Sequence, residues 1–249
     1  TSITLTGMGG EIQYFNIEDL TLDLGNGDDT VTIEDTHTGQ TNLNTRGGND
    51  TVYIHAISGI TNVDTGTGTD YIEVGNLAQV VDNIRTTLNL TGGDDADKLL
   101  IVDTGDTSIN TGYLYNSLIR GLDMGGDINY NTFEILTIGL GVSRDKFFVG
   151  GSGAGETTLN AGAGNDFVYA YPNRLPAPGI LVINGETGND MIIASAATVG
   201  LVLNGDQGND TIQGSSAHDL IGGGSGDDQL DGYFGNDEIY GDSTFPALA

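Results

Sequence analysis

Residues 205–240 form four consecutive nonapeptides, each with early glycines, an aspartate in sixth place and an apolar residue in eighth place. Glycine permits the positive φ and close backbone approach of a tight turn, and the three residues around each apolar side chain suit a short strand. No single repeat can bury its apolar residue alone, so such a chain must stack coils, two repeats to a coil. The aspartates are Asp210, Asp219, Asp228 and Asp237, and the apolar residues are Ile212, Ile221, Leu230 and Ile239.

Stacked coils bring the aspartates into a column. Each one lies 18 residues, or one coil, from its counterpart, which places it one strand spacing of ~4.8 Å away. Neighbouring carboxylates at that spacing repel each other by about 1 kcal/mol even in water. Calcium removes this repulsion, because it takes six to eight oxygens from carboxylates and backbone carbonyls. The pattern therefore predicts calcium-binding turns.

The nonapeptides match the pattern G-G-x-G-x-D-x-U-x, and the chain here resembles the repeats-in-toxin (RTX) family. The resemblance implies a parallel β-roll that binds calcium in its turns. It also implies a bacterial protein that leaves the cell unfolded, with a secretion signal at its extreme C-terminus. The segment 243–249 does not look like such a signal.

Aspartate turns recur through most of the chain at a longer period of about 20 residues, as between Asp29 and Asp50 or between Asp190 and Asp210. Alternating apolar residues enter and leave these turns, for example Val31 and Ile33, and this period of two is typical of strands. We therefore expect an all-β fold, a right-handed parallel β-roll or β-solenoid whose Asp/Gly-rich turns stack mainly along one edge.

A longer repeat lies over the coils. Met8–Tyr14 matches Met124–Tyr130 at an offset of 116 residues. We expect two multi-coil units in one continuous solenoid, residues 1–122 and 123–249. In this scheme Glu11 and Asp127 join the aspartate column, and loops bulge out at 76–86 and 105–118.

The candidate metal ligands are sixth-position aspartates of these turns. Three turns depart from the pattern and are expected to be weak or empty sites: Glu11 replaces aspartate, Asp145 follows Arg144, and Asp219 follows a turn that lacks two glycines. Asp219 stays among the candidates, which are Asp29, Asp50, Asp70, Asp97, Asp166, Asp190, Asp210, Asp219, Asp228 and Asp237.

The charge balance sets limits on partners. Thirty-five acidic residues against seven basic ones give a formal charge of −28, which disfavours nucleic acid and anionic membranes and favours cations. The longest nearly apolar run, 191–203, is too short to cross a bilayer, so no membrane insertion is expected. Cysteine is absent, so an extracellular chain of this kind is expected to be stabilised by bound metal instead of disulfides.

Catalytic motifs are missing from the sequence. The three histidines form no zinc-binding pair, and Gly151–Gly155 does not have the spacing of a nucleophile elbow. Polysaccharide-cleaving β-helices combine acids with Arg or Lys in aromatic grooves, whereas the basic residues here are scattered. We expect no enzyme.

The leading hypothesis is a calcium-stabilised structural or adhesin-type segment of a large secreted bacterial surface protein. The chain begins within an expected strand, Ile3–Leu5, without a polar cap, so neighbouring domains or other copies are expected to cover its ends. The alternative is an RTX secretion and calcium-triggered folding module of an exoenzyme or toxin. An ice-binding solenoid is disfavoured, because only Gly66–Thr69 has the required threonine pattern.

Overall fold

The protein is described by a computed structural model for residues 2–6, 12–13, 17–175 and 179–242. These residues form 24 β-strands and no helix. Accordingly, no segment among them is a helix that could cross a bilayer. The all-β parallel solenoid expected from the sequence is confirmed. The chain divides into two compact units: unit 1 runs to Asp103 and includes Ser117–Thr137, and unit 2 comprises Thr104–Asn116 and the residues from Ile138 onward.

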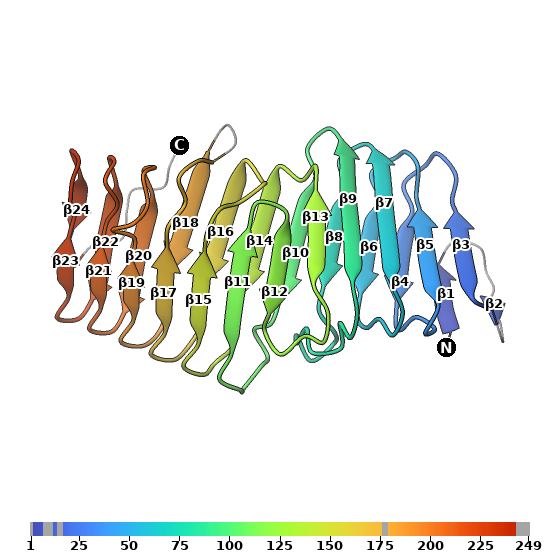
Figure 1. Ribbon diagram of the computed structural model, residues 1–249, viewed down its shortest axis with the longest axis horizontal. Coiled ribbons are helices and arrows are strands. Elements are labelled where there is room, and N and C mark those ends of the chain that lie inside the picture. The colour runs from blue at the N-terminus through green and yellow to red at the C-terminus, as the bar shows by residue number, and fades with distance from the viewer. Residues whose placement is uncertain (1, 7–11, 14–16, 176–178, 243–249) are drawn as a thin grey trace. The chain divides into compact units, whose positions relative to one another are not determined.

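Unit 1 has two sheets, and from β3 to β10 the strands alternate between them, so that each coil contributes one strand to each sheet (Figure 1). The first sheet has the order β1-β4-β6-β8-β10 with β2 beside β1, and the second has the order β12-β13-β9-β7-β5-β3. The strands are β1 (Ser2–Thr6), β2 (Ile12–Gln13), β3 (Asp19–Asp23), β4 (Thr30–Ile33), β5 (Gln40–Asn44), β6 (Thr51–Ile54), β7 (Thr61–Thr67), β8 (Tyr71–Val74), β9 (Leu88–Asp94), β10 (Lys98–Val102), β12 (Leu118–Gly121) and β13 (Ile128–Asn131).

Unit 2 repeats this arrangement with the orders β16-β18-β20-β22-β24 and β23-β21-β19-β17-β15-β11. Its strands are β11 (Thr111–Tyr115), β15 (Lys146–Val149), β16 (Glu156–Asn160), β17 (Phe167–Ala170), β18 (Ile180–Asn184), β19 (Met191–Ile193), β20 (Val202–Gln207), β21 (Thr211–Gln213), β22 (Leu220–Ser225), β23 (Gln229–Asp231) and β24 (Glu238–Tyr240). The residues of β14 (Ile135–Gly139) divide between the two units.

The core of each unit is built from columns of aliphatic side chains. In unit 2, Ile192 is in register with Val168 on one side and Ile212 on the other, and all three are at most 1% exposed. The neighbouring residues point to the outer face, because side chains alternate along a strand, and Met191 beside Ile192 is 44% exposed. Burying one such aliphatic side chain contributes about 1.5–3 kcal/mol, so the columns supply the main driving force for stacking.

Glycine has a conformational role at two positions of the turn. Gly208 and Gly226, in fourth place, have φ values of 136° and 137°, and Gly224, in second place, has a φ of 99°. A side chain at these φ values is strained. The second place accepts other residues at a cost, as Asp206 shows with a φ of 71°.

Two local features differ from the expected pattern. Strand β1 runs antiparallel to β4, and part of it also pairs with β2, so it does not begin the parallel stack as a lone edge strand. The segment 105–118 is not simply an outer loop, because it contains β11, which pairs with β15 in parallel.

Candidate metal centres in the aspartate turns

Sixth-position aspartates form a hydrogen-bonded ladder within unit 1. The backbone N–H of Asp29 donates to Oδ1 of Asp50 at 2.8 Å, and that of Asp50 donates to Oδ1 of Asp70 at 2.7 Å. Asp70 in turn donates to Asp97 at 2.8 Å. Each carboxylate therefore reaches back one coil and fixes the start of the preceding strand. The predicted stacking of Asp50 and Asp70 along one edge of this unit is what the geometry shows.

Unit 2 contains a longer ladder of the same kind. Its steps join the backbone N–H of one turn to Oδ1 of the next at 2.6–2.9 Å, and it runs through Asn110, Asp145, Asp166, Asp190, Asp210 and Asp228. A short ladder lies on the other turns of the last coils, where the N–H of Leu201 donates to Asp219 and that of Asp219 donates to Asp237.

The second carboxylate oxygen is the unusual feature of these turns. Oδ2 has no hydrogen-bond partner among the described residues and is buried in the seven turns of Asp50, Asp70, Asp97, Asp166, Asp190, Asp210 and Asp228. A buried polar atom without a partner is costly, and a buried carboxylate oxygen more so. These seven atoms at equivalent places mark the turns in which a cation could be the missing partner.

Burial also shifts the titration of these acids. Burial, opposed by backbone hydrogen bonds and reinforced by neighbouring carboxylates, raises the pKa of Asp166 and Asp190 to about 7 and that of Asp97 to about 6. The pKa values of Asp70 and Asp210 are raised for the same reasons. The metal-free turns therefore resist ionisation of their own ligands, as expected where a cation is required for balance.

Asp219 differs from the other candidates. Its Oδ1 accepts from Leu201 N–H and from the Ser215 hydroxyl, and its Oδ2 accepts from Ser215 N–H at 2.5 Å. Both oxygens are therefore satisfied within the protein. Asp219 therefore lacks the buried, unpartnered Oδ2 of the seven turns above.

The side chains in the fifth position of the turns form a second ladder, which was not predicted from the sequence. The fifth-position side chain accepts a hydrogen bond from the N–H of the following turn, as from Asn209 to Asn189 at 2.7 Å and from Asn189 to Asn165 at 2.9 Å. In unit 1 the same bond joins Asn49 N–H to Asp28 at 2.8 Å. The recurrent Asn-Asp pairs in the sequence were the available signal. Fifth-position bonds run opposite to sixth-position bonds, so adjacent turns are tied in both directions.

The ends of the ladders also differ from expectation. Glu134, not Asp127, follows Asp97: its Oε2 accepts the Asp97 N–H at 2.8 Å. Asp127 instead lies 3.7 Å from Arg120 in an exposed ion pair. Asn110 begins the ladder of unit 2 and was not predicted. Glu11 lies outside the described residues.

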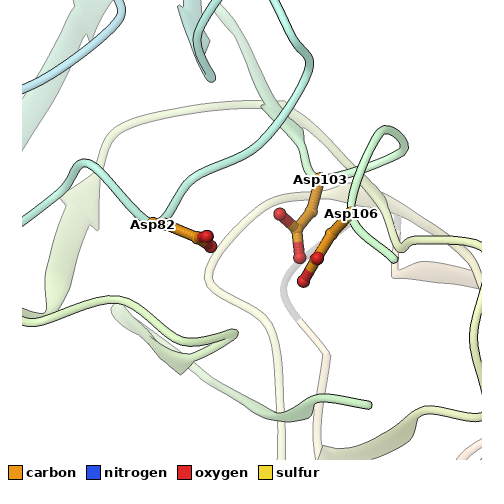
Figure 2. Close-up of side chains that lie close together, drawn as sticks. All are labelled: Asp82, Asp103 and Asp106. Atoms are coloured by element: carbon orange, nitrogen blue, oxygen red, sulfur yellow. The ribbon is translucent and has the colours of Figure 1, made fainter. Parts of the chain in front are cut away.

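A further pair of acids lies away from the turns in unit 1. Figure 2 shows Asp82 and Asp103, whose carboxylate oxygens lie within 4.8 Å of each other. Asp103 is fully buried and accepts the N–H of Val81 at 3.1 Å. Asp106, also labelled in Figure 2, belongs to unit 2, where it accepts the N–H of Ser108. The sequence pattern singled out none of these residues.

The family model described as the RTX calcium-binding nonapeptide repeat, in four copies, matches residues 149–172, 202–230 and 214–243. These ranges include the turns of Asp166, Asp210, Asp219, Asp228 and Asp237. The chain thus carries a segment of RTX repeats, which are non-catalytic calcium-binding modules. No curated protein shows significant similarity to the chain.

The residues of the ladders fit a calcium ion. The turns offer carboxylate oxygens and backbone carbonyls, which are the hard ligands that calcium prefers. Zinc would call for histidine or thiolate ligands, and neither side chain occurs in the Asp turns of the two long ladders. The buried Oδ2 atoms supply the unmatched negative charge that a divalent cation would balance.

Proposed function

We propose that this chain is a non-catalytic, calcium-stabilised structural segment of an extracellular protein, of the kind found in adhesin stalks and self-assembling surface fibres. The observation that carries the proposal is the set of buried Oδ2 atoms repeated from coil to coil. A single unpaired carboxylate oxygen could be a local irregularity. A row of them would destabilise the stack of coils unless a cation neutralises their charge.

Calcium held in the turns would supply the positive charge that their carboxylates lack. The chain's own residues place the ligands: the strand columns set the coil spacing, and the Oδ1 hydrogen bonds orient each carboxylate. Extracellular calcium is abundant, and a chain without cysteine has no disulfides to use in its place. The metal's binding free energy then becomes folding free energy.

The alternative function is a secretion and folding module of an exoenzyme or toxin. The continuous nonapeptides within 202–243 favour it, because coupling their folding to calcium keeps a chain unfolded where calcium is scarce and folds it outside the cell. In both functions the segment itself carries no catalysis. They differ in whether the folded segment assembles with other copies or neighbouring domains.

The proposal is tested by circular dichroism of the purified 249-residue chain in metal-free buffer, followed by a calcium titration. We expect β-structure to be gained with calcium and removed again by chelator. Magnesium is the matched control, and it should substitute poorly because it requires a tighter octahedral cage. A chain that binds no calcium, with the same spectrum and melting temperature in chelator and in calcium, would contradict the proposal.

A further inference from the structure

The first position of the turn separates the aspartate turns into two kinds. In the two long ladders it is glycine before Asp97, Asp190, Asp210 and Asp228, and it is Leu24, Thr45, Thr65 or Ala161 before Asp29, Asp50, Asp70 and Asp166. In the short ladder it is glycine before both Asp219 and Asp237. None of the first-position glycines has a positive φ, unlike the glycines in fourth place. Glycine is therefore not needed there for the backbone conformation, and what it provides is space.

The space at the first-position glycines lies between two oxygens. A Cβ added to Gly185 would lie 2.6 Å from Oδ2 of Asp190 and 2.7 Å from the carbonyl oxygen of Gly205 in the next turn. A Cβ on Gly205 would meet Oδ2 of Asp210 and the carbonyl oxygen of Gly223 in the same way.

The arrangement recurs at the two other glycine turns of the long ladders, Gly92 with Asp97 and Gly223 with Asp228, and at Gly214 with Asp219. At Gly232 the three nearest atoms all belong to Asp237, and none is a carbonyl oxygen of another turn. In the four long-ladder turns this carboxylate oxygen is the buried one that lacks a hydrogen-bond partner, whereas in the turn of Asp219 it accepts the N–H of Ser215. A carboxylate oxygen and a carbonyl oxygen thus face the same gap, and neither can donate a proton to the other.

In two turns of unit 1 the first-position residue is threonine, and its hydroxyl occupies the corresponding space. Oγ1 of Thr65 donates to the carbonyl oxygen of Gly92 at 2.7 Å, and Oγ1 of Thr45 donates to that of Thr65 at 3.0 Å. Each acceptor is the carbonyl oxygen of the first residue in the next turn. The equivalent carbonyl oxygens of Gly205 and Gly223 face the gap in the glycine turns. In these two turns the hydroxyl hydrogen therefore supplies a positive partner to the carbonyl oxygen.

We infer that a turn binds calcium when it has both a first-position glycine and a buried Oδ2 without a partner in the protein, and that only the turns of Asp97, Asp190, Asp210 and Asp228 meet both conditions. Thr45 and Thr65 replace the ion by a hydroxyl, and the methyl group of Ala161 fills the same place before Asp166. This inference rests on the proposed calcium-binding function. It goes beyond the repeat pattern, because it removes Asp29, Asp50, Asp70, Asp166, Asp219 and Asp237 from the ligand set and leaves unit 1 with one calcium turn.

The test counts calcium ions bound to the full chain by native mass spectrometry and by titration against a chelating dye. The wild-type chain should bind four ions at these turns, and Gly205→Thr should bind one fewer. Gly241→Thr is the matched control, because the space around a Cβ at Gly241 is open to 4 Å, and its count should equal the wild-type count.

The reverse change protects the test against a variant that fails to fold. Thr65→Gly should gain one ion beside Asp70, whereas Thr65→Ser keeps the hydroxyl and should gain none. Equal counts for Gly205→Thr and Gly241→Thr overturn the inference while leaving calcium binding in place, and so does a Thr65→Gly chain with the wild-type count. A wild-type chain that binds no calcium defeats the proposed function itself.

Discussion

The backbone N–H of Asp190 donates a 2.8 Å hydrogen bond to Oδ1 of Asp210, which lies 20 residues further along the chain. The same Asp210 carboxylate leaves Oδ2 buried without a hydrogen-bond partner. One side chain thus has two separable tasks. Oδ1 sets the register of the coils, and Oδ2 is available to a cation.

The two tasks of Asp210 can be separated by substitution. Asp210→Asn keeps an oxygen acceptor for Asp190 N–H but removes the charge, so calcium affinity should fall at least tenfold. The metal-free protein should become more stable by about 1 kcal/mol, the order of the repulsion removed. Asp210→Ala should lose both calcium binding and metal-free stability. Urea unfolding with and without calcium measures both effects, and a metal-free Asp210→Asn chain less stable than wild type would contradict the account.

The pH dependence of the metal-free protein follows from Asp166 and Asp190, whose pKa values are raised to about 7. Their value in an unfolded chain is about 4, so between these limits the folded state binds more protons. Stability is then fully present below pH ~4 and is lost as the pH rises through ~7. Urea unfolding in metal-free buffer across this range should show the decline. The double variant Asp166→Asn/Asp190→Asn should flatten it, and an equally steep decline in that variant would exclude these two groups as the cause.

The fifth-position ladder is testable at Asn189, whose side chain accepts the N–H of Asn209 at 2.7 Å. Asn189→Ala removes the acceptor and should cost about 0.5–1.5 kcal/mol, the net value of such a bond. Asn189→Asp keeps an acceptor, as Asp28 does at the equivalent place in unit 1, and should lose less. Thermal unfolding in saturating calcium compares the three proteins, and equal losses in both variants would refute the role of the bond.

The aliphatic columns should dominate stability in unit 2. Ile192→Ala leaves a cavity in a fully buried column and should destabilise the protein by about 2–5 kcal/mol. Its neighbour Met191 is 44% exposed, so Met191→Ala should change stability by less than about 0.5 kcal/mol. Chemical denaturation in calcium provides the comparison. Similar effects of the two substitutions would mean that the column is not the core of this unit.

Association should depend on calcium. The formal charge of −28 keeps chains apart, and calcium bound in the turns lowers it, so light scattering should report growth of multimers during a calcium titration. Magnesium at equal ionic strength should produce little growth. A chain that remains monomeric at saturating calcium would leave a stalk role intact but eliminate self-assembly.

The repeat architecture could be predicted from local patterns. Val31 and Ile33 alternate inward, and Asp50 and Asp70 recur at one coil length, so strand faces and the stacking of turns followed directly. Glu134 and Asn110 could not be recognised, because 37 residues separate Glu134 from Asp97 and 35 separate Asn110 from Asp145. At such separations the partner is chosen by how the intervening loops fold, and no fixed period marks it.

The ligand set was harder to read than the fold. The candidate ligands were predicted from the sixth-position aspartates, and the glycine in the first position was given no separate role. The structure distinguishes glycines that need a positive φ, such as Gly208, from glycines such as Gly205 that provide space beside a carboxylate. Both look alike in a sequence, because one residue type answers two different physical requirements.

The opposed fifth- and sixth-position ladders give each boundary between coils of unit 2 a mechanical character. Force that pulls one coil from the next loads both rows of side-chain bonds and the strand hydrogen bonds together, so no single row can yield first. Rupture should therefore remove a coil in one step. The 20 residues between Asp190 and Asp210 would extend by roughly 70 Å when freed. The chain would therefore lengthen under load in discrete steps, and the force needed for the step at a calcium-binding turn would rise when calcium is bound.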